Sequence, residues 1–134
     1  MTNQRIFVYA AVLLWLSALV NPSFAQPQGH MPETIMVVLH VKPGAEAELQ
    51  RVLEQHWTTA HEMKLVTDTP HLTMRCLENG NKMYFIDVFT WREASIPDAA
   101  PAEIRKLWEE MNRLVENREG HQGLELVPVS IVSR

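Results

Sequence analysis

This sequence of 134 residues has only one cysteine and lacks basic stretches and nucleotide-binding motifs. Its single cysteine, Cys76, cannot form a disulfide within the chain, so we expect it to be buried as a small apolar residue or to bridge two chains. The formal net charge is −4, and no run of Lys and Arg with interleaved aromatic residues occurs. These absences exclude the electrostatic footprint of nucleic-acid or anionic-membrane binding.

Catalytic and metal-binding motifs are also missing. No Walker, GxGxxG, Ser-His-Asp or Cys-His pattern occurs, so nucleotide hydrolysis, dinucleotide chemistry and acyl transfer have no support. His56 and His61 are five residues apart on a predicted helix, whereas helical zinc pairs use a spacing of four. No metal site is therefore expected, and His56 is interpreted as a core histidine on the apolar stripe.

The sequence has one long apolar run, residues 6–20, which follows Arg5. Small residues, Ser23 and Ala25, stand where a signal peptidase cleaves, so residues 1–25 are predicted to be a signal peptide removed before Gln26. A retained membrane anchor is the alternative, but the run is shorter than the roughly 20 residues that a span needs. We expect an exported protein, periplasmic or secreted, without membrane association after cleavage.

Residues 26–33, rich in Pro, Gln and Gly, are predicted to be a flexible arm that precedes a single domain at residues 34–134. Residues 34–42 are apolar and β-branched at nearly every position, which indicates a central strand. Pro43-Gly44 ends this strand, and acidic residues then open a helix. The residues that recur at helical spacing are Leu49, Val52, Leu53, His56, Trp57 and Ala60.

Two further strands, residues 71–78 and 82–91, are joined by Glu78-Asn79-Gly80, a hairpin signal. A second helix is predicted over residues 102–116, and a last strand over residues 124–132. Pro128 in this strand argues for an edge position. The βαββαβ order predicts an α+β, ferredoxin-like fold with a four-stranded antiparallel sheet and two helices on one face.

Alternation within the strands divides their side chains into two faces. The face expected to carry the helices comprises Ile35, Val37, Leu39, Val41, Leu72, Met74, Cys76, Tyr84, Ile86 and Val88. The opposite, open face is expected to comprise Met36, Val38, His40, His71, Thr73, Arg75, Leu77, Met83, Phe85, Asp87, Phe89 and Trp91. That set is too apolar to face water, so an identical sheet from a second chain is expected to cover it. The prediction is a homodimer with an enclosed cavity.

This division depends on the hairpin register. We assume a three-residue loop with Gly80 in a left-handed position, which places His71 roughly opposite Asp87. A slip of one residue would exchange the two faces.

The pattern resembles the antibiotic biosynthesis monooxygenase-like domains of the dimeric α/β-barrel superfamily over residues 34–132. The resemblance rests on Val41-Lys42-Pro43-Gly44-Ala45-Glu46, on Phe89-Thr90-Trp91-Arg92-Glu93-Ala94, and on the element order. It implies two sheets paired face to face. Members of such families include cofactor-free oxygenases of aromatic polyketides, quinol oxygenases, haem-degrading enzymes and proteins of no known activity.

Haem chemistry is not expected. Haem-degrading members carry a tryptophan at the end of the third strand, matched by Trp91, and an axial histidine about ten residues later. Here Pro101 and Ala102 stand near that place. No cofactor is therefore predicted.

The resemblance implies a cofactor-independent monooxygenase of a small phenolic or aromatic substrate. The polar residues expected to supply a general base, its orienting partner and an oxyanion donor are His40, His71, Arg75 and Asp87. The residues expected to bind the substrate are Met83, Phe85, Phe89 and Trp91. In the alternative, Arg75 and Asp87 form a structural ion pair, the aromatic residues pack a dimer interface, and the protein is a non-catalytic ligand-binding or interaction module.

Overall fold

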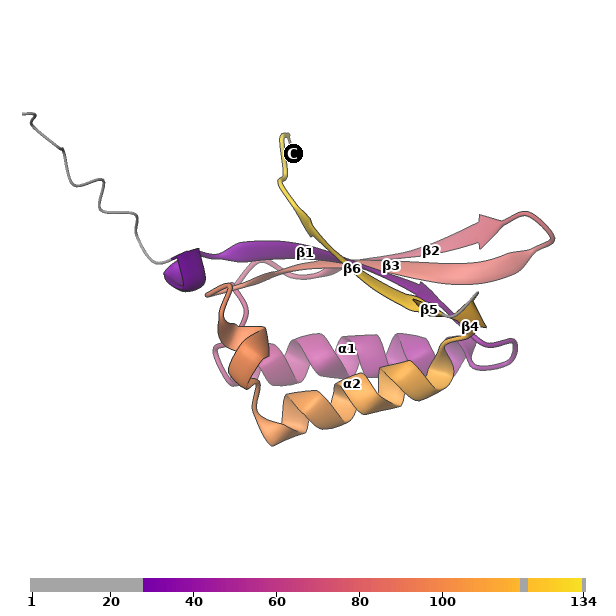
Figure 1. The fold of residues 1–134 in the computed structure, drawn as a ribbon, viewed down its shortest axis with the longest axis horizontal. Helices are drawn as coiled ribbons and strands as arrows, with labels where there is room; N and C mark the ends of the chain where they lie inside the picture. The colour runs from indigo at the N-terminus through magenta and orange to yellow at the C-terminus, as the bar shows by residue number, and fades with distance from the viewer. Residues whose placement is uncertain (1–27, 119–120, 134) are drawn as a thin grey trace, which may run out of the picture.

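A four-stranded antiparallel sheet carries two long helices on one face (Figure 1). The computed structural model describes residues 28–118 and 121–133, so the predicted signal peptide lies outside the described residues. The strands are β1 (Glu33–His40), β2 (Leu72–Glu78), β3 (Lys82–Trp91) and β6 (Leu124–Val129), in the order β2-β3-β1-β6. The helices are α1 (Glu46–Glu62) and α2 (Ala102–Leu114). The ferredoxin-like α+β prediction is confirmed, with β1 central and the proline-containing β6 at an edge.

Four short elements were not predicted. They are η1 (Gln28–His30), η2 (Ile96–Ala99), β4 (Asn117–Arg118) and β5 (His121–Gln122). The Gly29 carbonyl accepts bonds from the Ser95 backbone at 3.1 Å and from the Ser95 hydroxyl at 2.8 Å. The Ala94 amide donates to the Met31 carbonyl at 2.8 Å. Residues 28–33 therefore differ from the expected flexible arm, because backbone groups 60 positions and more away bind them.

The apolar stripes of both helices face the sheet. On α1 the buried residues are Leu49, Val52, Leu53, His56 and Ala60, and on α2 they are Ile104, Leu107, Met111 and Leu114. Helix α2 ends two residues earlier than expected, because Val115 is extended and forms an isolated β-bridge with Val41. The two stripes and one face of the sheet enclose a single core.

The hairpin between β2 and β3 has the expected register. Glu78 pairs with Lys82, so the loop contains three residues, and Gly80 has φ +86°. Such an angle is accessible to glycine at little cost. Met74 lies opposite Ile86 and Cys76 opposite Tyr84, as predicted.

The expected position of the hairpin relative to β1 is wrong. The prediction places Val37 and Ile86 on the same face of the sheet. In the structure Val37 pairs with Asp87, so Val37 and Asp87 share a face and Ile86 lies on the other. Consequently Phe85, Asp87, Phe89 and Trp91 face the helices and are buried, together with Ile35, Val37 and Leu39. Within β3, the rings of Phe85, Phe89 and Trp91 fill the space beneath the helices, whereas Ile86 and Val88 lie on the open face. Both sets are apolar, so alternation within the hairpin could not decide between them.

The open face consequently has other members than expected. Register places on it Met36, Val38, His40, Leu72, Met74, Cys76, Tyr84, Ile86, Val88 and Val127. Leu72 is 58% exposed, and Met74 and Val127 are also exposed. An apolar face without a covering layer is therefore present in the described chain, as expected, but its composition is aliphatic rather than aromatic.

In the described ranges, no helix combines the length and apolarity needed to cross a bilayer.

Candidate functional site

A cavity of about 550 Å³ lies between the sheet and the helices. It is lined by Glu33, Ile35, Val37, Leu53, His56, Asp87, Phe89, Trp91, Ala94, Pro97, Asp98, Trp108, Met111, Asn112, Leu124 and Leu126. Its inner end is made by buried residues of β1, β3 and α1, and its rim by half-buried Glu33 at the start of β1 and by exposed residues of η2, α2 and β6. The volume lies within the range of ordinary small-molecule sites.

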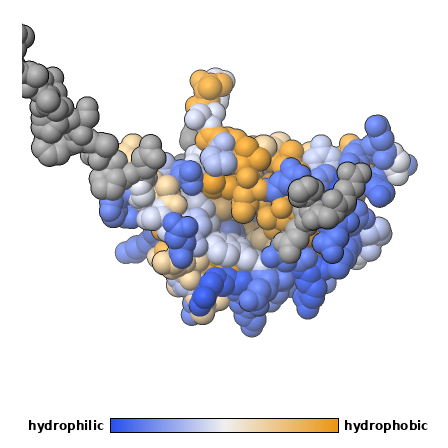
Figure 2. All heavy atoms as spheres, viewed as in Figure 1, coloured by the Kyte–Doolittle hydropathy of each residue, from blue (hydrophilic) through white to orange (hydrophobic). Residues whose placement is uncertain are grey.

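The part of the rim that β6 forms is apolar. Figure 2 shows hydrophobic side chains gathered over β6, where Leu126 is 64% exposed, and hydrophilic surface over the helices. An apolar side chain at the mouth of a cavity favours uptake of an apolar ligand body.

Three large aromatic rings and His56 form one cluster in the cavity wall, the aromatic cluster: His56, Phe89, Trp91 and Trp108. Phe89 and Trp91 meet edge to face, with ring centroids 4.9 Å apart, and Trp91 meets Trp108 likewise at 6.3 Å. His56 is edge-on to Phe89 at 5.4 Å and to Trp91 at 5.9 Å. Such walls recognise flat aromatic molecules by stacking and edge contacts.

His56 contributes one hydrogen-bond donor to this wall. Trp108 Nε1 donates to His56 Nε2 at 3.0 Å, and an indole nitrogen can only donate. In the neutral imidazole the proton therefore lies on Nδ1. The side chain is 2% exposed, and this burial lowers the pKa of His56 to about 4, so the ring is neutral at physiological pH. Within the described chain, the buried Nδ1 has no hydrogen-bond partner.

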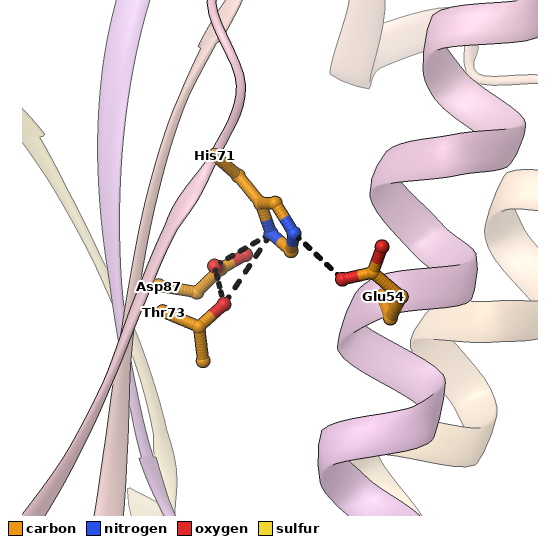
Figure 3. Close-up of polar contacts among 4 residues, drawn as sticks. All are labelled: Glu54, His71, Thr73 and Asp87. Atoms are coloured by element: carbon orange, nitrogen blue, oxygen red, sulfur yellow. Dashed lines mark hydrogen bonds and ion pairs between the residues drawn. The ribbon is translucent and has the colours of Figure 1, made fainter.

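Asp87 contributes one acceptor. Its side chain is 1% exposed, and its Oδ1 accepts bonds from His71 Nδ1 at 2.9 Å and from the Thr73 hydroxyl at 2.7 Å (Figure 3). The other oxygen, Oδ2, is buried and has no partner among the described residues. Buried polar atoms are almost always bonded, so Oδ2 is a hydrogen-bond acceptor that the described residues leave unused.

His71 connects Asp87 to the surface. Its Nε2 lies 3.1 Å from Oε2 of Glu54, a side chain that is 70% exposed (Figure 3). Only an imidazolium donates from both ring nitrogens, and the hydrogen bond to Asp87 is the main cause of the raised pKa of His71. The ring also stacks on Trp57, at 5.4 Å and 11°, an arrangement that favours a cation.

The described residues contain four buried side-chain N or O atoms without a partner. Two of them, His56 Nδ1 and Asp87 Oδ2, belong to residues that line this cavity, whereas His40 and Trp57 do not line it. One donor and one acceptor beside the aromatic cluster suit a ligand hydroxyl, which can both donate and accept.

A second hollow, of about 780 Å³, lies at the ends of β1, β3 and β6. It is larger, but Thr, Ser, Pro and aliphatic residues dominate its wall, and Glu33 is its only titratable side chain among the described residues. It offers no buried polar group, so the aromatic cavity is the better candidate site.

The structure brings together some of the predicted site residues. His71 and Asp87 are bonded, as their predicted proximity implied, and Phe89 and Trp91 line the same cavity as Asp87. Their expected location on the open face is wrong, because the register with β1 turns them beneath the helices. Phe85 is buried in the core and Met83 packs against it, and neither lines the cavity.

Arg75 and His40 stand apart from this site. Arg75 is exposed on β2, and among the described residues it forms no ion pair, so the expected structural pair with Asp87 is absent there. His40 lies on the open face, with its ring centroid 5.5 Å from that of Tyr84 and Nδ1 3.8 Å from Glu78. Neither residue reaches the aromatic cluster.

Sequence reasoning missed His56, Trp108 and Thr73 as site residues. His56 was interpreted as a core histidine, and its burial agrees with that interpretation. Its bond to Trp108, 52 positions away, has no local signal in the sequence. Within the described ranges, no three His, Cys, Asp or Glu side chains converge as metal ligands would.

No protein-family model matches the chain, and no curated protein matches its sequence. Solved structures do match. SnoaB, a cofactor-independent oxygenase from Streptomyces nogalater, matches with a TM-score of 0.57 and 13% identity, over 77% of this chain and 95% of that one. An antibiotic biosynthesis monooxygenase matches with a TM-score of 0.55 and 12% identity, over 75% and 99%.

A conserved protein from Methanosarcina mazei is similar as well, with a TM-score of 0.54 and 10% identity, over 76% of this chain and 94% of that one. At such identities the likeness concerns the fold and not the chemistry. The chain therefore has the antibiotic biosynthesis monooxygenase-like, ferredoxin-like fold.

Proposed function

We propose that this protein is a cofactor-independent monooxygenase that binds a small phenolic substrate in the cavity between helices and sheet. One observation carries the proposal: two residues that line one aromatic cavity each have a buried side-chain atom without a partner in the described part of the chain, a donor at His56 Nδ1 and an acceptor at Asp87 Oδ2. The reaction class follows that of SnoaB, a cofactor-independent oxygenase of similar fold.

Substrate activation begins with a proton transfer to Asp87. The phenolic hydroxyl donates to Asp87 Oδ2, which accepts the proton as general base. His56 Nδ1 then donates a hydrogen bond to the resulting oxyanion. Since both groups are buried, water competes little with these bonds, and their effect on the anion is large.

Oxygen then reacts with the substrate anion itself. In the enol form of an anthrone, loss of the hydroxyl proton makes the ring carbon that is the methylene of the keto form electron-rich. This carbon transfers its electrons to dioxygen and forms a carbon–oxygen bond. The peroxide takes back the proton from Asp87, and loss of water leaves a carbonyl. The methylene and O₂ thus give a carbonyl and H₂O, with all electrons supplied by the substrate.

His71 and Glu54 balance the charge of this step. The imidazolium of His71 stabilises the Asp87 carboxylate through the 2.9 Å bond. When Asp87 gains the substrate proton, the His71 imidazolium, which also donates to the exposed Glu54, remains protonated and offsets the charge of the substrate anion. Because the proton moves only from the substrate to Asp87, the buried site keeps its net charge during the reaction.

Oxygen consumption tests the proposal. The purified protein, free of metal and flavin, is given hydroquinones and 1,8-dihydroxyanthrone, beside the variants Asp87→Asn and Arg75→Ala. Because Asp87→Asn removes the proposed general base, we expect this variant to consume oxygen about 100-fold more slowly, or slower still. Arg75→Ala is the matched control, because Arg75 is exposed and outside the cavity, and it is expected to keep the wild-type rate. Equal rates in all three proteins, or no uptake on any substrate, would contradict the proposal.

A non-catalytic ligand-binding module is the second candidate. It is favoured by the bonding of Asp87 Oδ1, which already accepts from His71 and Thr73 as in a structural ion pair. This function predicts saturable binding of the same phenols without oxygen uptake.

The quaternary and cellular setting are further parts of the proposal. The exposed aliphatic open face supports a homodimer in which a second copy of the sheet covers Leu72, Met74 and Ile86. The apolar run at residues 6–20 supports export to the periplasm or the medium.

A further inference from the structure

The rim of the cavity carries a charge pattern that the proposed reaction does not use. Among the lining residues, Glu33, Asp87 and Asp98 are acidic, whereas Lys and Arg are absent from the described wall. At the inner end, the His71 imidazolium offsets the charge of Asp87. At the rim, neither Glu33 nor Asp98 has an ion-pair partner in the described part of the chain.

The two ends of the cavity thus present different chemistry. The inner end holds the buried donor and acceptor, on His56 and Asp87. The rim holds exposed Asp98 and Asn112 and half-buried Glu33. A phenol held by its hydroxyl at the inner end directs the substituent on the far side of its ring toward these carboxylates. Aromatic walls with nearby carboxylates attract cations, and two rim carboxylates repel an anion.

We infer that the cavity selects phenols whose distal substituent is cationic, accepts neutral ones less well, and rejects those with a distal carboxylate. This inference rests on the proposed ligand site but concerns binding alone. It deepens the proposed function by assigning the charge of the substrate, which the fold does not determine.

Three probes of similar size measure this selectivity: tyramine, 4-propylphenol and 4-hydroxyphenylacetate. Their dissociation constants are obtained by calorimetry with the full chain, without oxygen turnover. We expect tyramine to bind about tenfold more tightly than 4-hydroxyphenylacetate, with 4-propylphenol between them, at low salt, and a smaller ratio at high salt.

The variants locate the effect at the rim. In the double variant Glu33→Gln with Asp98→Asn, the ratio between tyramine and 4-hydroxyphenylacetate is expected to fall to about twofold. Glu125→Gln is the matched control, since Glu125 is an exposed acid on the open face, and it should keep the wild-type ratio.

Equal affinity for the three probes, tighter binding of the carboxylate, absence of binding by all three, or an unchanged ratio in the double variant would overturn the inference. Selective binding without oxygen uptake would uphold it and overturn the oxygenase. Oxygen uptake without charge selectivity would uphold the oxygenase and overturn the inference on charge.

Discussion

At the scale of single residues, two histidines with opposite environments define the site. His56 is enclosed by aromatic rings, and this burial lowers its pKa, whereas His71 lies between two carboxylates, which raise its pKa. A neutral donor and an ion-paired carboxylate in one cavity can bind a hydroxyl and its anion in turn. The pH responses of these two residues differ, and each gives a prediction.

Acid stability reports on His56. Its pKa of about 4 lies below the unfolded value of 6.5, so between these pH values the unfolded chain binds a proton that the folded chain does not. The free energy of unfolding therefore falls as pH falls from 6.5 to 4, by about 3 kcal/mol in all. Urea unfolding at several pH values should show this slope in the wild type and its loss in His56→Phe. The same slope in both proteins would contradict the assignment.

His71 acts in another pH window. Because its pKa is raised, it contributes stability below pH 6.5 that is lost as pH rises through its folded pKa. NMR titration of the ring should give a pKa above 6.5 in the wild type and a much lower one in Asp87→Asn. Glu54→Gln should lower the pKa less, because Glu54 is exposed. A pKa unaffected by Asp87→Asn would show that the ion pair is absent in solution.

At the scale of elements, α2 closes the cavity and the core together. Ile104 is fully buried, so Ile104→Ala removes apolar contacts and leaves a void, with an expected destabilisation of about 2–4 kcal/mol. Lys106→Ala on the exposed side of the same helix should change stability by less than about 0.5 kcal/mol. Thermal unfolding of both variants measures the contrast. A similar loss in the two would indicate that α2 does not pack as described.

Elements were predictable from sequence because their signals are local. Helical spacing in α1 and α2, the hairpin residues around Gly80 and the proline of β6 act within a few positions, and each is found where expected. The register of β1 against β3 has no such signal. It is decided by whether Phe85 and Phe89 or Ile86 and Val88 fit better beneath the helices, which depends on tertiary packing.

The site residues also divide into those with a local signal in the sequence and those placed by tertiary packing. The pairing of His71 with Asp87 followed from the hairpin register, which is local. The role of His56 depends on Trp108 from a distant helix, and in the sequence it could not be distinguished from that of a core histidine.

At the scale of the whole molecule, the sheet separates two apolar regions. One is the aromatic cavity beneath the helices, and the other is the aliphatic open face. If the open face forms the homodimer interface, Met74→Lys should convert dimers to monomers. Each protomer would then bring one lysine into the interface, and the two charges would lose hydration without gaining an opposite charge. Light scattering after size-exclusion chromatography measures the mass, and circular dichroism checks that the fold persists. A wild-type protein that is already monomeric would contradict the dimer.

The most direct measurement concerns which of these two regions binds the phenol. NMR contacts between bound 4-propylphenol and the protein distinguish them, since they report protons that lie close together. We expect contacts to the rings of Phe89, Trp91 and Trp108, which line the cavity. Contacts to Met74, Ile86 and Val88 instead would place the ligand on the open face and contradict the assignment of the site to Asp87 and His56.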